Sequence, residues 1–276
     1  MTMLLDTHFH YDFLPPQERA PFVAELARRG ACVVAQTLTP SAFVRLEAAE
    51  SAHDAVPRLS VGYHPWHIGP DYAAQLRVFA DALTRTRFVG EVGLDFAPRR
   101  LAEVPADLQT DVFRRLLDHI DSASLSDPHI LSIHTVRSAS TVLDLLESSG
   151  SSTARRPDSR VIAVFHRFGG TSDELTRLIR AGHYLSVNPA MLQSKRGRAY
   201  LARVPADRLL LETDLPTSPD SPPPNARETA NDVVSTLAST LSALAKLRGV
   251  DEEEITAAVA ATTERLYGVT CRPFSH

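Results

Sequence analysis

The sequence predicts an α/β protein of the (β/α)8 TIM-barrel class. Short aliphatic and β-branched segments alternate with segments of helical spacing along a chain of 276 residues. The short segments are almost continuously apolar, as expected for parallel strands that are covered on both faces. Eight strands that alternate with helices over about 250 residues are typical of this barrel. We therefore expect residues 1–276 to form a single barrel domain.

A doubly wound open sheet is the main alternative. That fold normally has about five or six parallel strands, and it carries a glycine-rich phosphate turn after the first strand. At this position the sequence instead reads Asp6-Thr7-His8-Phe9-His10, without a glycine. The barrel is therefore the better prediction.

Each expected strand is a short run of aliphatic residues that ends at polar or turn-forming residues. Runs of this length and composition are typical of buried strands rather than of helices. The eight expected strands are residues 3–9, 32–38, 59–64, 87–93, 130–135, 161–166, 184–188 and 209–214.

The segments between these strands have the apolar spacing of helices. Phe113, Leu116 and Ile120, for example, recur at intervals of three and four residues. Two longer helices are expected at the end of the chain, over residues 226–247 and 251–266. Asp251 is the expected N-cap of the last helix, with Glu254 three residues later.

Two segments are expected to be irregular loops. Ser148 to Arg160 is rich in serine, arginine and proline, which predicts a flexible insertion before the sixth strand. Leu215 to Asn225 contains five prolines. Proline removes backbone donors, so this segment is expected to be neither a strand nor a helix.

Histidines and carboxylates occur at the carboxyl ends of the expected strands. In a barrel these ends face one mouth, where the active sites of this fold are built. His8 and His10 lie two positions apart, so both point to one face of their strand, as two ligands of one ion must. Buried imidazoles and carboxylates are costly unless they are paired or bind a metal. We therefore predict a metal site from His8, His10, His64, Glu91, His134, His166 and Asp214.

The ligand types indicate two ions rather than one. Four imidazoles (His8, His10, His134, His166) and two carboxylates suit two divalent ions bridged by a carboxylate. Such a pair polarises a phosphoryl or carbonyl oxygen and activates water near neutral pH. Mixed nitrogen and oxygen ligands fit zinc, manganese or iron, with magnesium as a further candidate.

The fourth strand indicates which residue bridges the ions. Many binuclear amidohydrolase barrels use a carboxylated lysine on this strand, but the only lysines here are Lys195 and Lys246, which lie elsewhere. Glu91 stands on the expected fourth strand and is therefore the expected bridge.

The order and spacing of these motifs resemble the TatD family of metal-dependent deoxyribonucleases along nearly the whole chain. The matching motifs are Asp6-Thr7-His8-Phe9-His10, Gly62-Tyr63-His64-Pro65, Gly90-Glu91-Val92-Gly93-Leu94-Asp95, Ile133-His134, His166-Arg167-Phe168-Gly169-Gly170 and Glu212-Thr213-Asp214-Leu215-Pro216.

The resemblance implies a role for each of these residues. His8, His10, Glu91 and Asp214 would hold the first ion, and Glu91, His134 and His166 the second. His64 would lie beside the substrate phosphate, and Asp214 would also orient or deprotonate the attacking water. The implied reaction is hydrolysis of DNA phosphodiester bonds, often from the 3′ end, on single strands or strand ends.

Several positions depart from the family pattern. The family arginine two residues after the fifth-strand histidine is absent, and Arg137 stands three residues after His134. Gly169 replaces a common serine, and Thr262 replaces a common asparagine. The proline-rich loop after Asp214 also lacks the usual Arg-Gly stretch. These changes indicate a divergent branch.

Two segments indicate which branch this is. Thr37 to Phe43 and Leu131 to Leu146 resemble the TatD-type nuclease of the Qat anti-phage system. That resemblance implies a role in antiviral defence and protein partners in a defence complex.

Two other functions remain open from the sequence. The same ligands could serve a hydrolase of a lactone, amide or aminoacyl ester, because ligand types do not separate acyl from phosphoryl transfer. The chain could also be a subunit whose activity depends on a partner that docks on its two long loops.

Composition limits the partners and the compartment. The net charge of −4, from 29 basic and 33 acidic residues, argues against binding nucleic acid by bulk charge. The two cysteines form no disulfide framework, and neither a signal peptide nor a membrane span is evident. We therefore expect a cytoplasmic enzyme.

Overall fold

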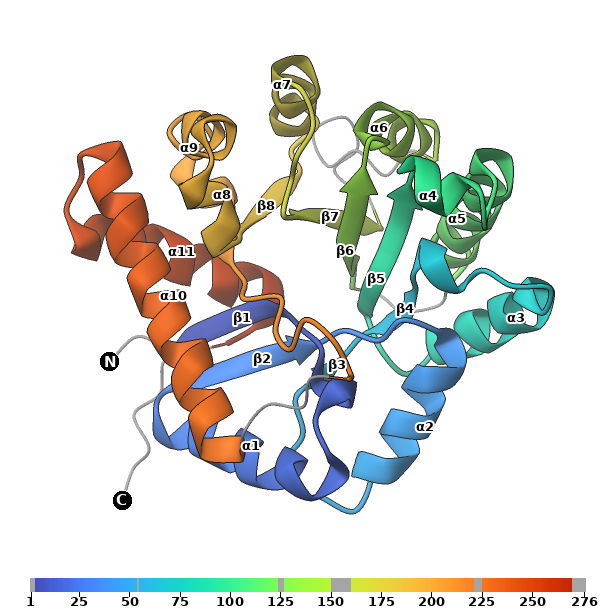
Figure 1. Cartoon of the computed structure of the whole chain (residues 1–276), viewed down its shortest axis with the longest axis horizontal. Helices are drawn as coiled ribbons and strands as arrows, with labels where there is room; N and C mark the ends of the chain where they lie inside the picture. The colour runs from blue at the N-terminus through green and yellow to red at the C-terminus, as the bar shows by residue number, and fades with distance from the viewer. Residues whose placement is uncertain (1–2, 54, 124–126, 150–159, 221–224, 270–276) are drawn as a thin grey trace. The chain divides into compact units, whose positions relative to one another are not determined.

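The computed structural model describes residues 3–53, 55–123, 127–149, 160–220 and 225–269. Strands and helices alternate as the sequence predicts (Figure 1). Backbone contacts divide the chain into two compact units. The first comprises residues 1–35, 53–58 and 186–276, and the second comprises residues 36–52 and 59–185.

The first unit contains the two ends of the chain. Strands β1 and β2 pair in parallel, with Leu5 opposite Cys32. The phenyl rings of Phe9 and Phe22 stack at 4.9 Å, and both side chains are fully buried. The elements of this unit are β1 (Leu4–Phe9), η1 (Tyr11–Phe13), α1 (Pro16–Arg28), β2 (Ala31–Ala35), α8 (Pro189–Gln193), α9 (Lys195–Leu201), η3 (Ala206–Arg208), β9 (Leu209–Leu211), α10 (Ala226–Arg248) and α11 (Glu252–Tyr267).

The long helix α10 covers this unit by packing along α1 (Figure 1). It begins at Asn225, whose side chain accepts the backbone N–H of Glu228, and it ends at Gly249. Gly249 has a φ of 67°, a left-handed conformation that glycine adopts without steric cost. These two residues fix the ends of the helix, and its apolar stripe fixes the face that it buries.

The second unit contains four neighbouring strands in sequence order, β4, β5, β6 and β7. Helix α5 covers them with a stripe of Val112, Phe113, Leu116 and Ile120, which are all buried. The elements are α2 (Pro40–Glu50), β4 (Val61–Tyr63), η2 (Pro65–His67), α3 (Tyr72–Ala82), β5 (Phe88–Asp95), α4 (Pro98–Leu101), α5 (Ala106–Asp121), β6 (His129–Val136), α6 (Ala139–Ser148), β7 (Val161–His166) and α7 (Ser172–Arg180). The sequence boundaries between the two units fall within strands β3 (Arg58–Leu59) and β8 (Tyr184–Val187).

All eight expected strands are present, and only the sixth has the expected limits at both ends; three of the others are divided or end three residues early, and the remaining four differ by one or two residues. The third is divided at Ser60 into β3 and β4. The second ends at Ala35 rather than at residue 38, because Thr37 instead donates its hydroxyl to the Ser60 carbonyl and accepts the N–H of Gly62. The eighth ends at Leu211 rather than at residue 214, because the residues that follow turn to hydrogen-bond with the end of β1.

The expected helix starts and loops are only partly confirmed. Asp251 is the N-cap of α11, but its side chain makes no capping hydrogen bond; a capping box instead joins Thr171 and Glu174 at α7. Most of the expected Ser148–Arg160 insertion and part of the proline-rich loop lie outside the described residues. Among the described residues, no helix combines the length and apolar character that crossing a bilayer requires.

Candidate active site

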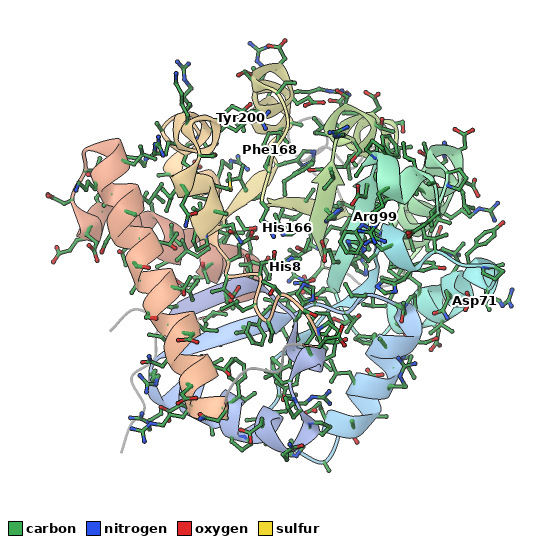
Figure 2. All side chains as sticks on the ribbon, viewed as in Figure 1. His8, Asp71, Arg99, His166, Phe168 and Tyr200 are labelled. Carbon is green, nitrogen blue, oxygen red and sulfur yellow. The ribbon has the colours of Figure 1, made fainter. Side chains whose placement is uncertain are left out.

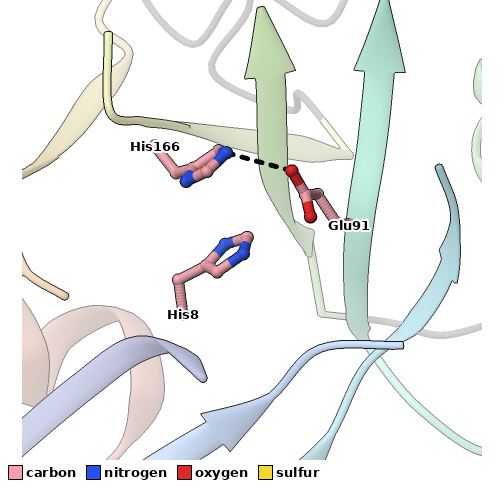
Figure 3. Close-up of side chains that lie close together, drawn as sticks. All are labelled: His8, Glu91 and His166. Atoms are coloured by element: carbon pink, nitrogen blue, oxygen red, sulfur yellow. Dashed lines mark ion pairs between the residues drawn. The ribbon is translucent and has the colours of Figure 1, made fainter. Parts of the chain in front are cut away.

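Three of the expected ligands come together within the first unit, and we call them the first ligand set: His8, His10 and Asp214. His8 projects from β1 (Figure 3), and His10 follows the end of that strand. Asp214 Oδ1 lies 3.6 Å from His8 Nε2 and 3.3 Å from His10 Nε2. All three residues are buried. One carboxylate oxygen thus faces two imidazole nitrogens.

The backbone holds Asp214 against the end of β1. The Asp214 N–H donates to the His8 carbonyl at 3.0 Å, and the His10 N–H donates to the Leu215 carbonyl at 2.7 Å. Asp214 has a φ of 63°, a left-handed conformation that costs energy in a residue with a Cβ. Strain of this kind concentrates at functional sites, where surrounding contacts enforce it.

Asp6 connects the two segments that carry the first ligand set. Its carboxylate accepts the backbone N–H groups of His8 and Thr213, at 3.0 and 3.1 Å, and also the Thr213 hydroxyl. Burial raises the pKa of Asp6 to about 7, although these three hydrogen bonds oppose the rise. The sequence motif contains Asp6 but assigns it no role, because its partner Thr213 lies 207 residues away in the sequence.

The second unit brings together another group of expected ligands, and we call Glu91, His134 and His166 the second ligand set. Glu91 Oε1 lies 2.8 Å from His134 Nδ1 and 3.0 Å from His166 Nε2. Figure 3 shows the second of these ion pairs as a dashed line. Glu91 and His166 are buried, and the His134 side chain is only 12% exposed.

His64 lies beside the second ligand set. Its Nε2 is 3.5 Å from Glu91 Oε1, and its ring centroid is 4.5 Å from that of His134. Its Nδ1 accepts the backbone N–H of Trp66 at 3.2 Å. Burial lowers the pKa of His64 to about 4, so the ring is neutral at pH 7 and carries its proton on Nε2. The ring therefore presents a hydrogen-bond donor on the Glu91 side.

Asp95 contacts the other edge of the His134 ring. Asp95 Oδ2 lies 3.4 Å from His134 Nε2 and accepts the indole N–H of Trp66 at 2.7 Å. Burial would raise the pKa of Asp95, but hydrogen bonds from His134, the Ala97 N–H and Trp66 lower it to about 2. This carboxylate is therefore ionised at neutral pH.

The two carboxylates raise the pKa of His134. Burial lowers the pKa of His134, but the hydrogen bonds to Asp95 and Glu91 outweigh burial and raise it. Helix α5 fixes Asp95 in turn, because Gln109 accepts the Asp95 N–H and donates to its carbonyl. Asp95 was likewise quoted above only as part of a motif. Asp95 is the last residue of β5, two residues beyond the expected end of the fourth strand, so the expected strand ends did not include it.

Three arginines that follow strands β5 and β8 in the sequence have different surroundings. Arg99 lies exposed on α4 (Figure 2) and makes no ion pair among the described residues. Arg100 instead pairs with Glu103 at 2.9 Å, and its guanidinium lies 3.7 Å from the centre of the Trp66 ring. In the first unit, Arg198 donates to the Leu192 carbonyl at 3.1 Å.

The donor sets fit divalent metal ions. Among the described residues of each unit, one group of three has its ligand atoms within 4.8 Å of one another: His8, His10 and Asp214 in the first, and His64, Glu91 and His134 in the second. Neutral imidazole nitrogen and carboxylate oxygen are ligands that zinc and manganese accept. Burial of these polar groups is costly unless they are paired or bind a metal.

Comparison with known proteins places nearly the whole chain in one family. The model of the family described as "TatD related DNase" matches residues 5–268. The chain is 28% identical to a "3'-5' ssDNA/RNA exonuclease TatD" of Citrobacter rodentium, over 77% of this chain and 78% of that protein. It is 32% identical to the protein of the same name from Cronobacter sakazakii, over 75% of this chain and 76% of that protein.

Solved structures agree on the fold. YJJV, a TatD homolog from Escherichia coli, matches with a TM-score of 0.74 at 22% identity and covers 97% of this chain and 98% of that chain. A hydrolase of the TatD family from Entamoeba histolytica gives the same TM-score at 16% identity, over 98% and 99% of the two chains. The (β/α)8 TIM-barrel class predicted from the sequence is thereby confirmed. The chain belongs to the TatD-related DNase family and is a metal-dependent hydrolase.

Proposed function

We propose that this protein is a two-metal nuclease that hydrolyses phosphodiester bonds of single-stranded DNA, from the 3′ end. The observation that carries the proposal is that Asp214 faces His8 and His10, and Glu91 faces His134 and His166, in a chain of this family. The names of the bacterial relatives, which describe 3′-5′ exonucleases of single-stranded DNA and RNA, support the substrate. The unbroken family match over residues 5–268 supports one barrel domain over residues 1–276.

Each ligand set would hold one divalent ion, of zinc, manganese or magnesium. His8, His10 and Asp214 supply two nitrogens and an oxygen for the first, and Glu91, His134 and His166 do the same for the second. When bound, such ions polarise phosphoryl oxygens and lower the pKa of water. Asp95 orients the His134 ring, as carboxylates behind metal-binding histidines commonly do.

Asp214 is the proposed base for the attacking water. Its Oδ1 faces His8 and His10, and its side chain is 12% exposed. The bond from the Asp214 N–H to the His8 carbonyl, and the next one from the His10 N–H to the Leu215 carbonyl, fix its position, so the carboxylate is oriented before substrate binds. Asp214 would take the proton of the water as the oxygen attacks phosphorus.

His64 is the proposed donor to a phosphoryl oxygen. Because Nδ1 is occupied by the Trp66 N–H, the proton resides on Nε2. Its lowered pKa keeps the ring neutral over the whole physiological range. A neutral donor stabilises growing negative charge on the phosphoryl oxygens without a change in protonation.

A cleavage assay on labelled strands tests the proposal. The metal-loaded protein is incubated with single strands labelled at the 3′ or the 5′ end, with and without chelator. We expect the 3′ label to be released as mononucleotide and the 5′-labelled strand to shorten progressively, with both reactions stopped by chelator. Absence of cleavage under every metal, together with turnover of a lactone or aminoacyl ester, would establish the acyl hydrolase instead.

A role in anti-phage defence rests on the resemblance of Thr37–Phe43 and Leu131–Leu146 to a Qat nuclease. We propose this role for the chain together with protein partners. Phage plating on cells that carry the gene with its genomic neighbours tests it. Protection that is lost with Glu91→Ala would support the role, and equal plating with and without the gene would exclude it.

A further inference from the structure

The indole of Trp66 is exposed at the edge of the second ligand set. Its exposed fraction is 45%, which makes it one of three large hydrophobic side chains that are exposed among the described residues. The other two are the smaller side chains Val44 and Val56. Tryptophan is usually mostly buried, so an exposed indole beside buried catalytic groups indicates a binding role.

We propose that Trp66 and Arg100 form a stacking site for a nucleobase of the substrate strand, adjacent to the phosphate that is cleaved. This inference rests on the proposed nuclease function and adds a substrate contact to it. We call these two side chains the Trp66–Arg100 stack.

Two contacts hold the stack in place before substrate binds. The indole N–H donates to Asp95 Oδ2 at 2.7 Å. The Arg100 guanidinium carbon lies 3.7 Å from the centre of the indole ring. The Arg100 Nη1 donates to Glu103 Oε2 at 2.9 Å. A rigid platform loses little conformational entropy on binding, which favours affinity.

The position of the stack ties it to the reacting phosphate. Trp66 is two residues from His64, and the two ring centroids lie 5.0 Å apart. The His134 ring is 6.3 Å from the indole. A base that lies on the stack therefore belongs to a nucleotide next to the phosphate that His64 contacts.

The chemistry of the stack favours nucleic acid over a protein partner. Every base has a π-face, so stacking on an aromatic ring or a guanidinium tolerates any sequence, as an exonuclease requires. Arg100 adds positive charge, which attracts the phosphates on either side of the base. The net charge of the chain is −4, so local cations must supply this attraction.

The composition of the chain makes the test direct, because Trp66 is its only tryptophan. Intrinsic fluorescence is measured in chelator, without turnover, while oligothymidylate or an abasic strand of equal length is added. We expect oligothymidylate to quench the emission and the abasic strand to leave it nearly unchanged. Equal quenching by both strands, or none by either, would overturn the proposal.

Variants separate stacking from the hydrogen bond to Asp95. Trp66→Leu removes the ring face, and Trp66→Phe keeps a face but loses the N–H. Binding of a labelled oligothymidylate, followed by anisotropy, should weaken about tenfold or more in Trp66→Leu and much less in Trp66→Phe. Wild-type affinity in Trp66→Leu would contradict the proposal. Unchanged affinity for DNA with loss of a co-purifying protein would instead identify a protein docking site.

Arg100→Gln tests the charge of Arg100, and Arg114 on α5 provides a matched control. Arg114 also pairs with a carboxylate three residues away, Asp111, at 3.6 Å. Arg100→Gln should weaken binding and reduce its salt dependence, whereas Arg114→Gln should change neither. Equal effects of both variants would show bulk charge rather than a site. Because these are binding measurements in chelator, failure of cleavage and failure of stacking remain distinguishable.

Discussion

Asp95 Oδ2 lies 3.4 Å from Nε2 of His134, on the ring edge opposite the one that faces Glu91. His134 is thus held between two carboxylates, one within the second ligand set and one behind it. A ring fixed from both edges presents Nδ1 toward Glu91 in one orientation. Asp95 is therefore a positioning residue for a ligand.

Asp95→Asn tests this positioning role. The amide is the same size but carries no charge, so the pKa of His134 should fall and the ring should be held less firmly. We expect metal affinity to decrease about 10- to 100-fold, as is typical for such partners. Metal titration measures this, and excess metal should restore part of the activity. A matched exposed variant, Asp118→Asn, should bind metal normally.

Glu91→Gln tests the central carboxylate of the second ligand set. The amide preserves volume but removes the charge that faces His134 and His166, so we expect turnover to be abolished and bound metal to be lost. Far-UV circular dichroism should remain that of the wild type, because β5 is held by its neighbouring strands. Full activity in this variant would show that Glu91 holds no catalytic metal.

Asp214→Asn tests the proposed base. Loss of general base catalysis should lower kcat by about 100- to 10,000-fold. Asp220, in the same loop, is exposed and serves as the control, since Asp220→Asn should retain the wild-type kcat.

The limits of sequence-based prediction follow from the same residues. Glu91, His134 and His166 were predicted as ligands because apolar strand patterns fix where each strand ends, and the structure brings them together. Asp6 and Asp95 were not assigned, because their partners Thr213 and Gln109 are set by tertiary contacts that no local pattern encodes. The eighth strand ends earlier than predicted for the same reason, because Thr213 makes a tertiary hydrogen bond to Asp6.

The unfolding free energy of the metal-free protein should vary with pH because of His129, the first residue of β6. Burial lowers the pKa of His129 to about 4, below the value of 6.5 in the unfolded chain. The unfolded state therefore takes up a proton first, and stability is lost as the pH falls from about 6.5 to about 4. The loss attributable to this residue is on the order of 3 kcal/mol.

Denaturant unfolding at several pH values measures this contribution. His129→Gln should flatten the decrease in unfolding free energy between about pH 7 and pH 4. An unchanged slope in His129→Gln would show that the ring is protonated equally in both states.

Metal analysis of the purified protein and two variants tests the central claim most directly. The two ligand sets predict about two divalent ions per wild-type chain. His10→Ala, in the first set, and His134→Ala, in the second, should each lower this number and abolish release of a 3′ label from single-stranded DNA. A wild-type protein that binds no divalent ion, or a variant that keeps both full occupancy and full activity, would contradict the two-metal assignment.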